Sequence, residues 1–363
     1  MKKITVITTG GTIGSILKSD SAGIDSSSQR VFEEIQQAGI SLNYSIEIVS
    51  PLNKNSESFT PSDWVKVLRC ISEANDSDAD GIVVTHGTDT MAHTIAAALV
   101  YSNIWSKTVC FTGAFLPPEH SDSDTSLNLR AALAFAANPN SADGIFLAFR
   151  ANQFNSEAKI IDGADIKPMM FDDLLFNSAY DETVSTFTPV NGFANIADIA
   201  SAQSESQSHP QSKPQPKKNP CIGTTKFPDE DNINQAQSNI ACLTLYPGID
   251  QKLLEAVAKD RKVLILEMYH SGTGPAGINV DNGEQSDLIN FIQSQSKDIT
   301  ILMGAFPKKH IEPPYDSTKQ IKQAGAHIYA DLQTHLLYAF SLLCLSSGFS
   351  GEEIVRKLSD WEI

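Results

Sequence analysis

The sequence predicts an α/β protein with two domains: a larger N-terminal domain built on a mostly parallel sheet flanked by helices, and a smaller C-terminal α/β domain. Strand-like and helix-like segments alternate up to about residue 140, which is typical of βαβ units. A polar stretch rich in Ser, Gln and Pro then lacks the apolar residues that a core requires, and alternation resumes after it. We therefore expect a domain over residues 1–195, an insertion or linker over 196–237 and a second domain over 238–363.

The N-terminal domain is expected to contain short apolar strands, each followed by a turn. These strands are Ile4–Thr8, Tyr44–Val49, Gly81–Thr85, Val109–Thr112 and Gly144–Phe149. Helices are expected near Gln29–Gln37 and from Pro61, Thr90 and Asp124. The helix at Pro61 has the clearest start, because Thr60 can cap it, proline suits the first helical position and Asp63 completes a capping-box pattern.

The C-terminal domain repeats the alternation on a smaller scale. The expected strands are Ile240–Leu245, Val263–Met268 and Ile299–Met303. Helices are expected from Asp250 and Gln285, around Ser317–Ala324 and over Leu332–Leu345, with a last helix that Ser350 and Glu353 can cap.

Composition excludes several classes of partner. The chain has 363 residues and a net charge of −16, so electrostatic attachment to nucleic acid or to an anionic membrane surface is not expected. The five cysteines are scattered and form no CxxC pair, which argues against a disulfide framework and against a zinc site. The start of the chain lacks a signal-peptide pattern, and no apolar run reaches spanning length. We expect a cytoplasmic protein that acts on a small molecule, with no metal.

Two short stretches each place threonines just past an expected strand: Thr9–Gly14, which reads TGGTIG, and Thr85–Thr90, which reads THGTDT. Chemistry in open α/β sheets gathers at the carboxyl ends of strands. The first stretch matches neither the dinucleotide-binding GxGxxG spacing nor the P-loop pattern, which argues against a nucleotide-binding enzyme. Its glycines can instead bring backbone N–H groups close to a ligand. Thr12 can be a nucleophile or simply a turn or capping residue.

The second stretch offers more candidate groups than helix capping requires. Asp89 or Thr90 could cap the helix that follows, which leaves Thr88 unexplained. His86 could be a general base or a buried structural residue.

Together, TGGTIG at Thr9–Gly14 and HGTDTM at His86–Met91 resemble the paired signature of the bacterial-type L-asparaginases, the asparaginase/glutaminase family. Within that family the chain is most similar to the cytoplasmic type I enzymes. Further segments are similar to that family over residues 1 to about 180 and about 240 to 360. These segments are Asn55–Pro61, Thr112-Gly113-Ala114, Ser123-Asp124, Asn128-Leu129 and Tyr246-Pro247-Gly248.

The resemblance implies a catalytic apparatus of two threonines, an aspartate and a lysine. Thr12 would attack the side-chain amide carbon, and water activated near Thr88 and Asp89 would hydrolyse the ester that forms. For the lysine we choose Lys167, because Asp165-Ile166-Lys167 matches the family's lysine segment. Lys159 is the alternative, since it lies nearer to the preceding strand.

Given this resemblance, the charges of an amino-acid amide indicate how it would be bound. Asp89 and Glu57 would hold the α-ammonium group, while Ser56 and backbone N–H groups around Gly11 and Gly87 would hold the α-carboxylate. The carbonyl of Ala114 would accept a hydrogen bond from the leaving amide. Glu57 departs from the family, in which a neutral residue is common at this position.

Two further departures concern the loop that follows the first stretch and a segment of the C-terminal domain. In the family this loop usually supplies a tyrosine over the nucleophile. Residues 15–28 of this chain contain no tyrosine, and Ile24 stands in its place. Tyr269–Pro275 replaces the family's more usual glycine-asparagine pattern. We expect an enzyme that hydrolyses L-asparagine without a cofactor, as a homodimer or homotetramer, the oligomeric state being implied by the family. The alternatives are a broader amidase or glutaminase and a non-catalytic amino-acid sensor of the same fold.

Overall fold

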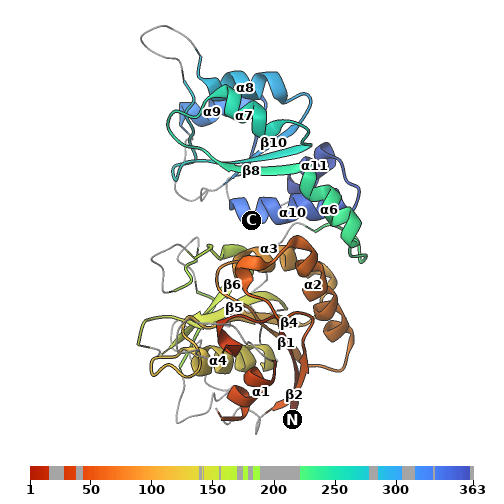
Figure 1. Cartoon of the computed structure of the whole chain (residues 1–363), viewed down its shortest axis with the longest axis vertical. Coiled ribbons are helices and arrows are strands. Elements are labelled where there is room, and N and C mark those ends of the chain that lie inside the picture. The colour runs from red at the N-terminus through yellow and green to blue at the C-terminus, as the bar shows by residue number, and fades with distance from the viewer. Residues whose placement is uncertain are drawn as a thin grey trace, which may run out of the picture. The chain divides into compact units, whose positions relative to one another are not determined.

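The computed structural model describes residues 1–15, 28–37, 44–138, 141, 143–154, 157–169, 175–178, 183–188, 221–277, 285–304, 315–329 and 332–359. The chain divides into two compact units, Met1–Asn219 and Pro220–Ile363 (Figure 1). Each unit contains a sheet with helices on its faces, as the predicted α/β class requires. Residues 196–220 of the expected linker lie outside the described residues. Among the described residues, no helix is long and apolar enough to cross a membrane.

The first unit is built on a seven-stranded sheet in the order β2-β1-β3-β4-β5-β6-β7. Its strands are β1 (Lys2–Thr8), β2 (Tyr44–Val49), β3 (Gly81–Thr85), β4 (Thr108–Thr112), β5 (Gly144–Arg150), β6 (Ala158–Asp162) and β7 (Ser185–Phe187). The strands from β2 to β5 are parallel, and β6 and β7 continue the sheet in antiparallel fashion. The strand order reverses direction between β1 and β3, because the chain adds β2 on one side of β1 and β3 on the other.

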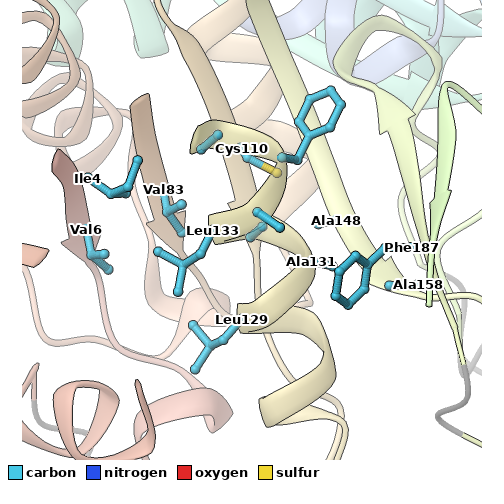
Figure 2. Packing of buried hydrophobic residues seen from close by; sticks show 14 of the residues in the cluster. Ile4, Val6, Val83, Cys110, Leu129, Ala131, Leu133, Ala148, Ala158 and Phe187 are labelled. Atoms are coloured by element: carbon cyan, nitrogen blue, oxygen red, sulfur yellow. The ribbon is translucent and has the colours of Figure 1, made fainter. Parts of the chain in front are cut away.

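Helices cover both faces of this sheet. They are α1 (Ser28–Gln37) and α4 (Thr125–Ala137) on one face, and α2 (Pro61–Asp76) and α3 (Met91–Leu99) on the other. Figure 2 shows Leu129 and Leu133 of α4 packed over the sheet residues Val6 and Val83, all of them buried. The small residues of α4 allow the helix to lie close to the strands. Burial of this apolar surface stabilises the unit and fixes the strand ends that carry the two threonine motifs.

The second unit has a parallel four-stranded sheet in the order β11-β10-β9-β8. Its strands are β8 (Ile240–Thr244), β9 (Val263–Glu267), β10 (Thr300–Gly304) and β11 (His327–Ile328). Its helices are α6 (Glu230–Ser238), α7 (Gln251–Ala258), α8 (Asp287–Gln295), α9 (Asp316–Ala324), α10 (Thr334–Ser346) and α11 (Gly351–Ser359). Residues of α7, α8 and α9 form one core cluster with alternate residues of the strands, while α6 and α10 pack against each other.

Some elements were not anticipated from the sequence. Strands β6 and β7 extend the first sheet beyond β5. Helix α6 occupies part of the segment that we expected to be polar linker, with Ile233 and Ala236 buried at helical spacing. The capping boxes expected at Thr60 and Asp63 and at Ser350 and Glu353 are both present.

Candidate active site

The two threonine motifs emerge side by side at the carboxyl edge of the first sheet. Strands β1 and β3 pair in parallel with Thr8 opposite Thr85, so the turns that carry Thr12 and Thr88 leave the same edge. The strand order reverses at this point, which in open α/β sheets is where crevices for ligands form. Thr12 begins the short helix η1 (Thr12–Gly14), and both Thr12 and Thr88 are half-buried.

The backbones of the two motifs touch at two glycines. A Cβ atom on Gly11 would lie 2.7 Å from the Cα and N atoms of Gly87, and Gly11 has a φ of +84°, in the left-handed region. A Cβ atom on Gly87 would in turn lie 2.6 Å from the Oγ atom of Ser56. The structure therefore requires glycine at both positions, since any side chain would push the three segments apart. This contact brings Gly11, Gly87 and Ser56 together.

Hydrogen bonds at Thr9 reinforce the same contact. The N–H and the hydroxyl of Thr9 both donate to the Thr85 carbonyl, at 3.2 and 2.9 Å. The Thr9 carbonyl accepts from the N–H of Lys54 at 3.0 Å. The first motif is thus tied to β3 on one side and to the Ser56 segment on the other.

Ser56 and the residues of the second motif form a small polar cluster. Ser56 begins the short helix η3 (Ser56–Ser58), is buried, and donates from Oγ to Oδ2 of Asp89 at 3.2 Å. The Thr90 hydroxyl donates to the Ser56 carbonyl at 2.7 Å. Thr90 occupies the N-cap position of α3, but its side chain makes no capping hydrogen bond. Asp89 and Glu57 are exposed.

A buried carboxylate, Asp63, holds the segment that carries Ser56. The Asp63 side chain is 1% exposed and accepts from Lys54 Nζ at 2.7 Å and from the N–H and hydroxyl of Thr60 at 3.0 Å. Burial alone raises the pKa of Asp63, but these hydrogen bonds, with one from Lys66, outweigh burial and lower its pKa below the usual 3.8. Lys54 and Thr60, which lie on either side of Ser56 in the chain, are therefore both held by the Asp63 carboxylate.

His86 has a structural role and is not a base. It is fully buried, and its Nδ1 lies 2.8 Å from the Gly87 carbonyl, an acceptor, so Nδ1 carries the proton. Its Nε2 lies 2.9 Å from the Thr94 hydroxyl, and its ring packs 4.4 Å from that of Phe59. Burial lowers the pKa of His86 to about 4, against the opposing effects of the Gly87 hydrogen bond and the Asp89 charge. The imidazole is therefore neutral and inaccessible near neutral pH.

Ala114 lies at the third strand end of the same edge. The N–H of His86 donates to the Thr112 carbonyl at 2.9 Å, which joins the end of β4 to the second motif. A Cβ atom on Gly113 would lie 2.4 Å from the His86 carbonyl oxygen. Ala114, which follows, is 1% exposed. The turns after β1, β3 and β4 therefore form one continuous surface at the strand ends.

The lysine assignment stays a prediction. Lys167 is exposed, and its N–H donates to the Asn177 carbonyl at 3.0 Å. Lys159 is half-buried on β6, where it pairs with Phe149 and Thr186. Neither lysine has a contact with Thr88 among the interactions of the described residues. Ile24 lies outside the described residues.

Sequence reasoning missed the groups that hold the site together. Asp63 could be identified only as a capping residue, and Thr94 only as a helix residue, although both contact segments that carry site residues. Their spacing from the motifs carried no signal. Within the described part of the chain, no group of His, Cys, Asp and Glu side chains is arranged to hold a metal ion.

The comparisons with known proteins identify the family. A family model described as "Asparaginase, N-terminal" matches residues 3–187, which carry all the strand ends described above. The chain belongs to the asparaginase family. It is an asparaginase-family amidohydrolase.

Individual relatives of this amidohydrolase carry two kinds of name. An L-asparaginase of Thermococcus kodakarensis is 29% identical over 275 residues, 75% of this chain and 73% of that protein. A protein of Methanococcus vannielii named as a subunit of glutamyl-tRNA(Gln) amidotransferase is 23% identical over 346 residues, 93% of this chain and 73% of that protein. The amidotransferase subunit of the same name from Thermoplasma acidophilum is 33% identical over 137 residues, which span 37% of this chain and only 32% of that protein.

Solved structures establish the fold. The thermostable L-asparaginase from Thermococcus kodakarensis superposes with a TM-score of 0.71 at 24% identity, over 98% of this chain and 96% of that one. L-asparaginase I from Vibrio cholerae superposes with a TM-score of 0.69 at 22% identity, over the same shares of the two chains. The predicted α/β class with a larger N-terminal and a smaller C-terminal sheet is confirmed.

Proposed function

We propose that this amidohydrolase converts L-asparagine to L-aspartate and ammonia. The observation that carries the proposal is the contact of Gly11 with Gly87, which brings Thr12 and Thr88 to one edge at the reversal of strand order. The name of the Thermococcus kodakarensis relative supports the same substrate. Two hydroxyls and a carboxylate at the ends of parallel strands are suited to acyl transfer through a covalent intermediate.

In the proposed reaction Thr12 is the nucleophile. Its hydroxyl oxygen attacks the side-chain amide carbon, the C–N bond breaks, and ammonia leaves with the proton that the hydroxyl gave up. Water then attacks the resulting β-aspartyl ester and regenerates Thr12. Thr88, with Asp89 and Lys167, relays the proton and activates the water. A relay is required because a threonine hydroxyl is a weak nucleophile until a neighbouring group draws off its proton.

The proposed binding of the substrate follows from charge. Asp89 and Glu57 offer exposed carboxylates to the α-ammonium group. Ser56 and the backbone N–H groups around Gly11 and Gly87 face the α-carboxylate. The Ala114 carbonyl accepts a hydrogen bond from the side-chain amide, and an amide that is bound this way presents its carbon to Thr12.

The relatives named as amidotransferase subunits favour a second candidate, hydrolysis of the glutamine amide. Asparagine and glutamine differ by one methylene, which a pocket discriminates by only about 1–3 kcal/mol. The net charge of −16 argues against direct contact of this chain with tRNA phosphates. For the second candidate function we therefore propose free glutamine or another small amide as the substrate.

A substrate panel tests the proposal. Ammonia release is measured from L-asparagine, D-asparagine, L-glutamine and peptides with terminal amides. The proposal expects the highest kcat/KM with L-asparagine, and a preference for L-glutamine would favour the second candidate. Protein that binds L-asparagine but releases ammonia from none of these amides would contradict both candidates and indicate a sensor.

The lysine is tested in the same assay with Lys167→Met and Lys159→Met, and Lys252→Met, an exposed lysine of α7, is the matched control. Loss of activity in Lys167→Met alone is expected. Loss in Lys159→Met alone would reassign the relay to that residue. The exposed control is expected to retain full activity.

A further inference from the structure

Asp124 occupies the capping position of α4 but does not cap the helix. An aspartate directly before a helix ordinarily accepts hydrogen bonds from the first free N–H groups of that helix. The Asp124 side chain makes no such bond. Its carboxylate turns instead to the loop after β4, where Oδ1 and Oδ2 accept from the N–H of Phe115 at 2.9 and 3.0 Å and Oδ1 accepts from the N–H of Leu116 at 3.0 Å.

Asn128, one helical turn further along α4, holds the same loop from a second direction. Its Nδ2 donates to the Gly113 carbonyl and to Oδ2 of Asp124, both at 2.9 Å. Both partners are acceptors, so the amide must present its NH2 group to them. The Oδ1 atom of the fully buried Asn128 has no hydrogen-bond partner among the described residues. An unpaired buried oxygen destabilises the fold, so holding the loop in this way has an energetic cost.

These bonds fix the two peptide groups on either side of Ala114. A trans peptide is planar, with its C=O and N–H pointing in opposite directions. Because the N–H of Phe115 points at Asp124, the carbonyl of Ala114 points away from Asp124. Because the carbonyl of Gly113 points at Asn128, the N–H of Ala114 points away from Asn128. The direction of the Ala114 carbonyl is therefore set by side chains at the start of α4.

Arg150, the last residue of β5, keeps Asp124 in place. Its Nε lies 3.8 Å from Oδ2 of Asp124, and its guanidinium lies 5.0 Å from the centroid of the Phe115 ring. The side chains of Arg150 and Asp124 are 4% and 0% exposed. A carboxylate this deeply buried requires a countercharge and several donors, and here its donors are the loop N–H groups and Asn128.

We propose that Asp124 and Asn128 are positioning residues that aim the Ala114 carbonyl at the side-chain amide of the substrate. The inference rests on the proposed function, in which that carbonyl accepts from the amide NH2 group. It predicts that substitutions of Asp124 or Asn128 slow the hydrolysis of amides more than the hydrolysis of esters. The methyl ester of the same side chain has no N–H to donate, so its reaction with Thr12 gains nothing from the Ala114 carbonyl.

The experiment compares kcat/KM for L-asparagine with kcat/KM for L-aspartate β-methyl ester in each protein. The ratio of the two values does not depend on the fraction of protein that is folded. Asn128→Leu keeps the side-chain volume but removes both donated bonds, and we expect its amide-to-ester ratio to fall about three- to tenfold. Asp124→Asn retains one acceptor oxygen, and we expect a smaller fall in the same direction.

The matched control is Asn138→Leu, because Asn138 is buried at the opposite end of α4. It disturbs the same helix without touching the Ala114 loop, so its ratio stays at the wild-type value. Equal losses of amide and ester hydrolysis in Asn128→Leu and Asp124→Asn would show that the network is only structural and overturn the inference. Wild-type protein that releases no ammonia from any amide would instead overturn the proposed function, and the inference with it.

Discussion

The carboxyl edges of the two parallel sheets are built differently. At the first edge, the turns after β1, β3 and β4 contact one another, and the Thr9 hydroxyl, the Thr90 hydroxyl and the His86 N–H all bond to segments outside their own turns. At the second edge, the turn after β9 has two backbone bonds within itself and accepts one bond from α9, where the Thr318 hydroxyl donates to the Gly272 carbonyl at 2.7 Å. The N–H of Tyr269 donates to the Thr273 carbonyl, and that of Gly272 donates to the Tyr269 carbonyl, both at 2.8 Å.

The difference follows from strand order. In the first sheet the chain places β2 on one side of β1 and β3 on the other, so the strand order reverses at β1. In the second sheet β8, β9, β10 and β11 succeed one another in one direction, so no such reversal occurs in its described strands. We therefore place the proposed site at the first edge, where the strand order reverses.

Two glycines with the same sign of φ provide the sharpest test of this comparison. Gly11 and Gly248 have φ values of +84° and +86°, but a Cβ atom would meet the Gly87 backbone at Gly11 and nothing within 4 Å at Gly248. Gly248→Ala should lower the free energy of unfolding by about 1–2 kcal/mol through backbone strain alone. Gly11→Ala should lower it further and reduce kcat/KM for L-asparagine about a hundredfold, because it displaces Gly87. Equal effects of the two variants on activity would contradict the contact.

The next largest expected effect is on stability, and it comes from comparing two capping carboxylates, Asp63 and Glu353. Asp63→Ala should lower the free energy of unfolding of the first unit by about 2–3 kcal/mol, because it breaks a buried pair and a capping box together. Trp64 and Trp105 are buried in the first unit, so their fluorescence during urea unfolding measures the loss. Glu353→Ala, in the exposed capping box of α11, should change this transition little.

The Asp63 effect should also depend on pH. The pKa of Asp63 is lowered in the folded protein, so its stabilisation is fully present above the ordinary pKa of 3.8 and disappears as the pH falls through the lower folded value. The difference between wild type and Asp63→Ala should therefore be constant from about pH 5 to about pH 7 and narrow below about pH 4. A difference that grows on acidification would contradict the lowered pKa.

A second pH dependence concerns His86. Its pKa of about 4 lies below the ordinary value of 6.5, so the unfolded chain binds a proton that the folded chain does not between these pH values. Stability should therefore fall as the pH drops from 6.5 towards 4, with a slope of at most about 1.4 kcal/mol per pH unit from this group. His86→Gln should remove that contribution. A slope unchanged by the substitution would show that His86 is not buried in its neutral form.

Much of the fold could be predicted from the sequence, because the apolar runs and the capping pattern at Thr60 and Asp63 are local. Strands β6 and β7 were missed because they pair in antiparallel fashion after a region read as parallel. Helix α6 was missed because Ile233 and Ala236 are its only buried residues in a polar stretch. Tertiary contacts with α10 and β8 decide its structure.

The candidate site, like the fold, could be predicted only in part from the sequence. Thr12, Thr88 and Ala114 could be placed at strand ends because the strands themselves were visible as apolar runs. The contact of Gly11 with Gly87 and Ser56 could not, since it joins residues distant in sequence whose proximity depends on strand order. Asp124 looked like an ordinary helix start, and only the structure shows that its carboxylate faces the Ala114 loop.

One measurement tests the central claim, that Thr12 at the first edge is the nucleophile. Ammonia release from L-asparagine is compared between wild type, Thr12→Ala and Thr244→Ala, which removes a hydroxyl bonded to Glu267 at the edge of the second sheet. We expect Thr12→Ala to lower kcat at least about a thousandfold. Thr244→Ala should stay within about twofold of wild type. Substantial ammonia release by Thr12→Ala, or equal losses in both variants, would contradict the account.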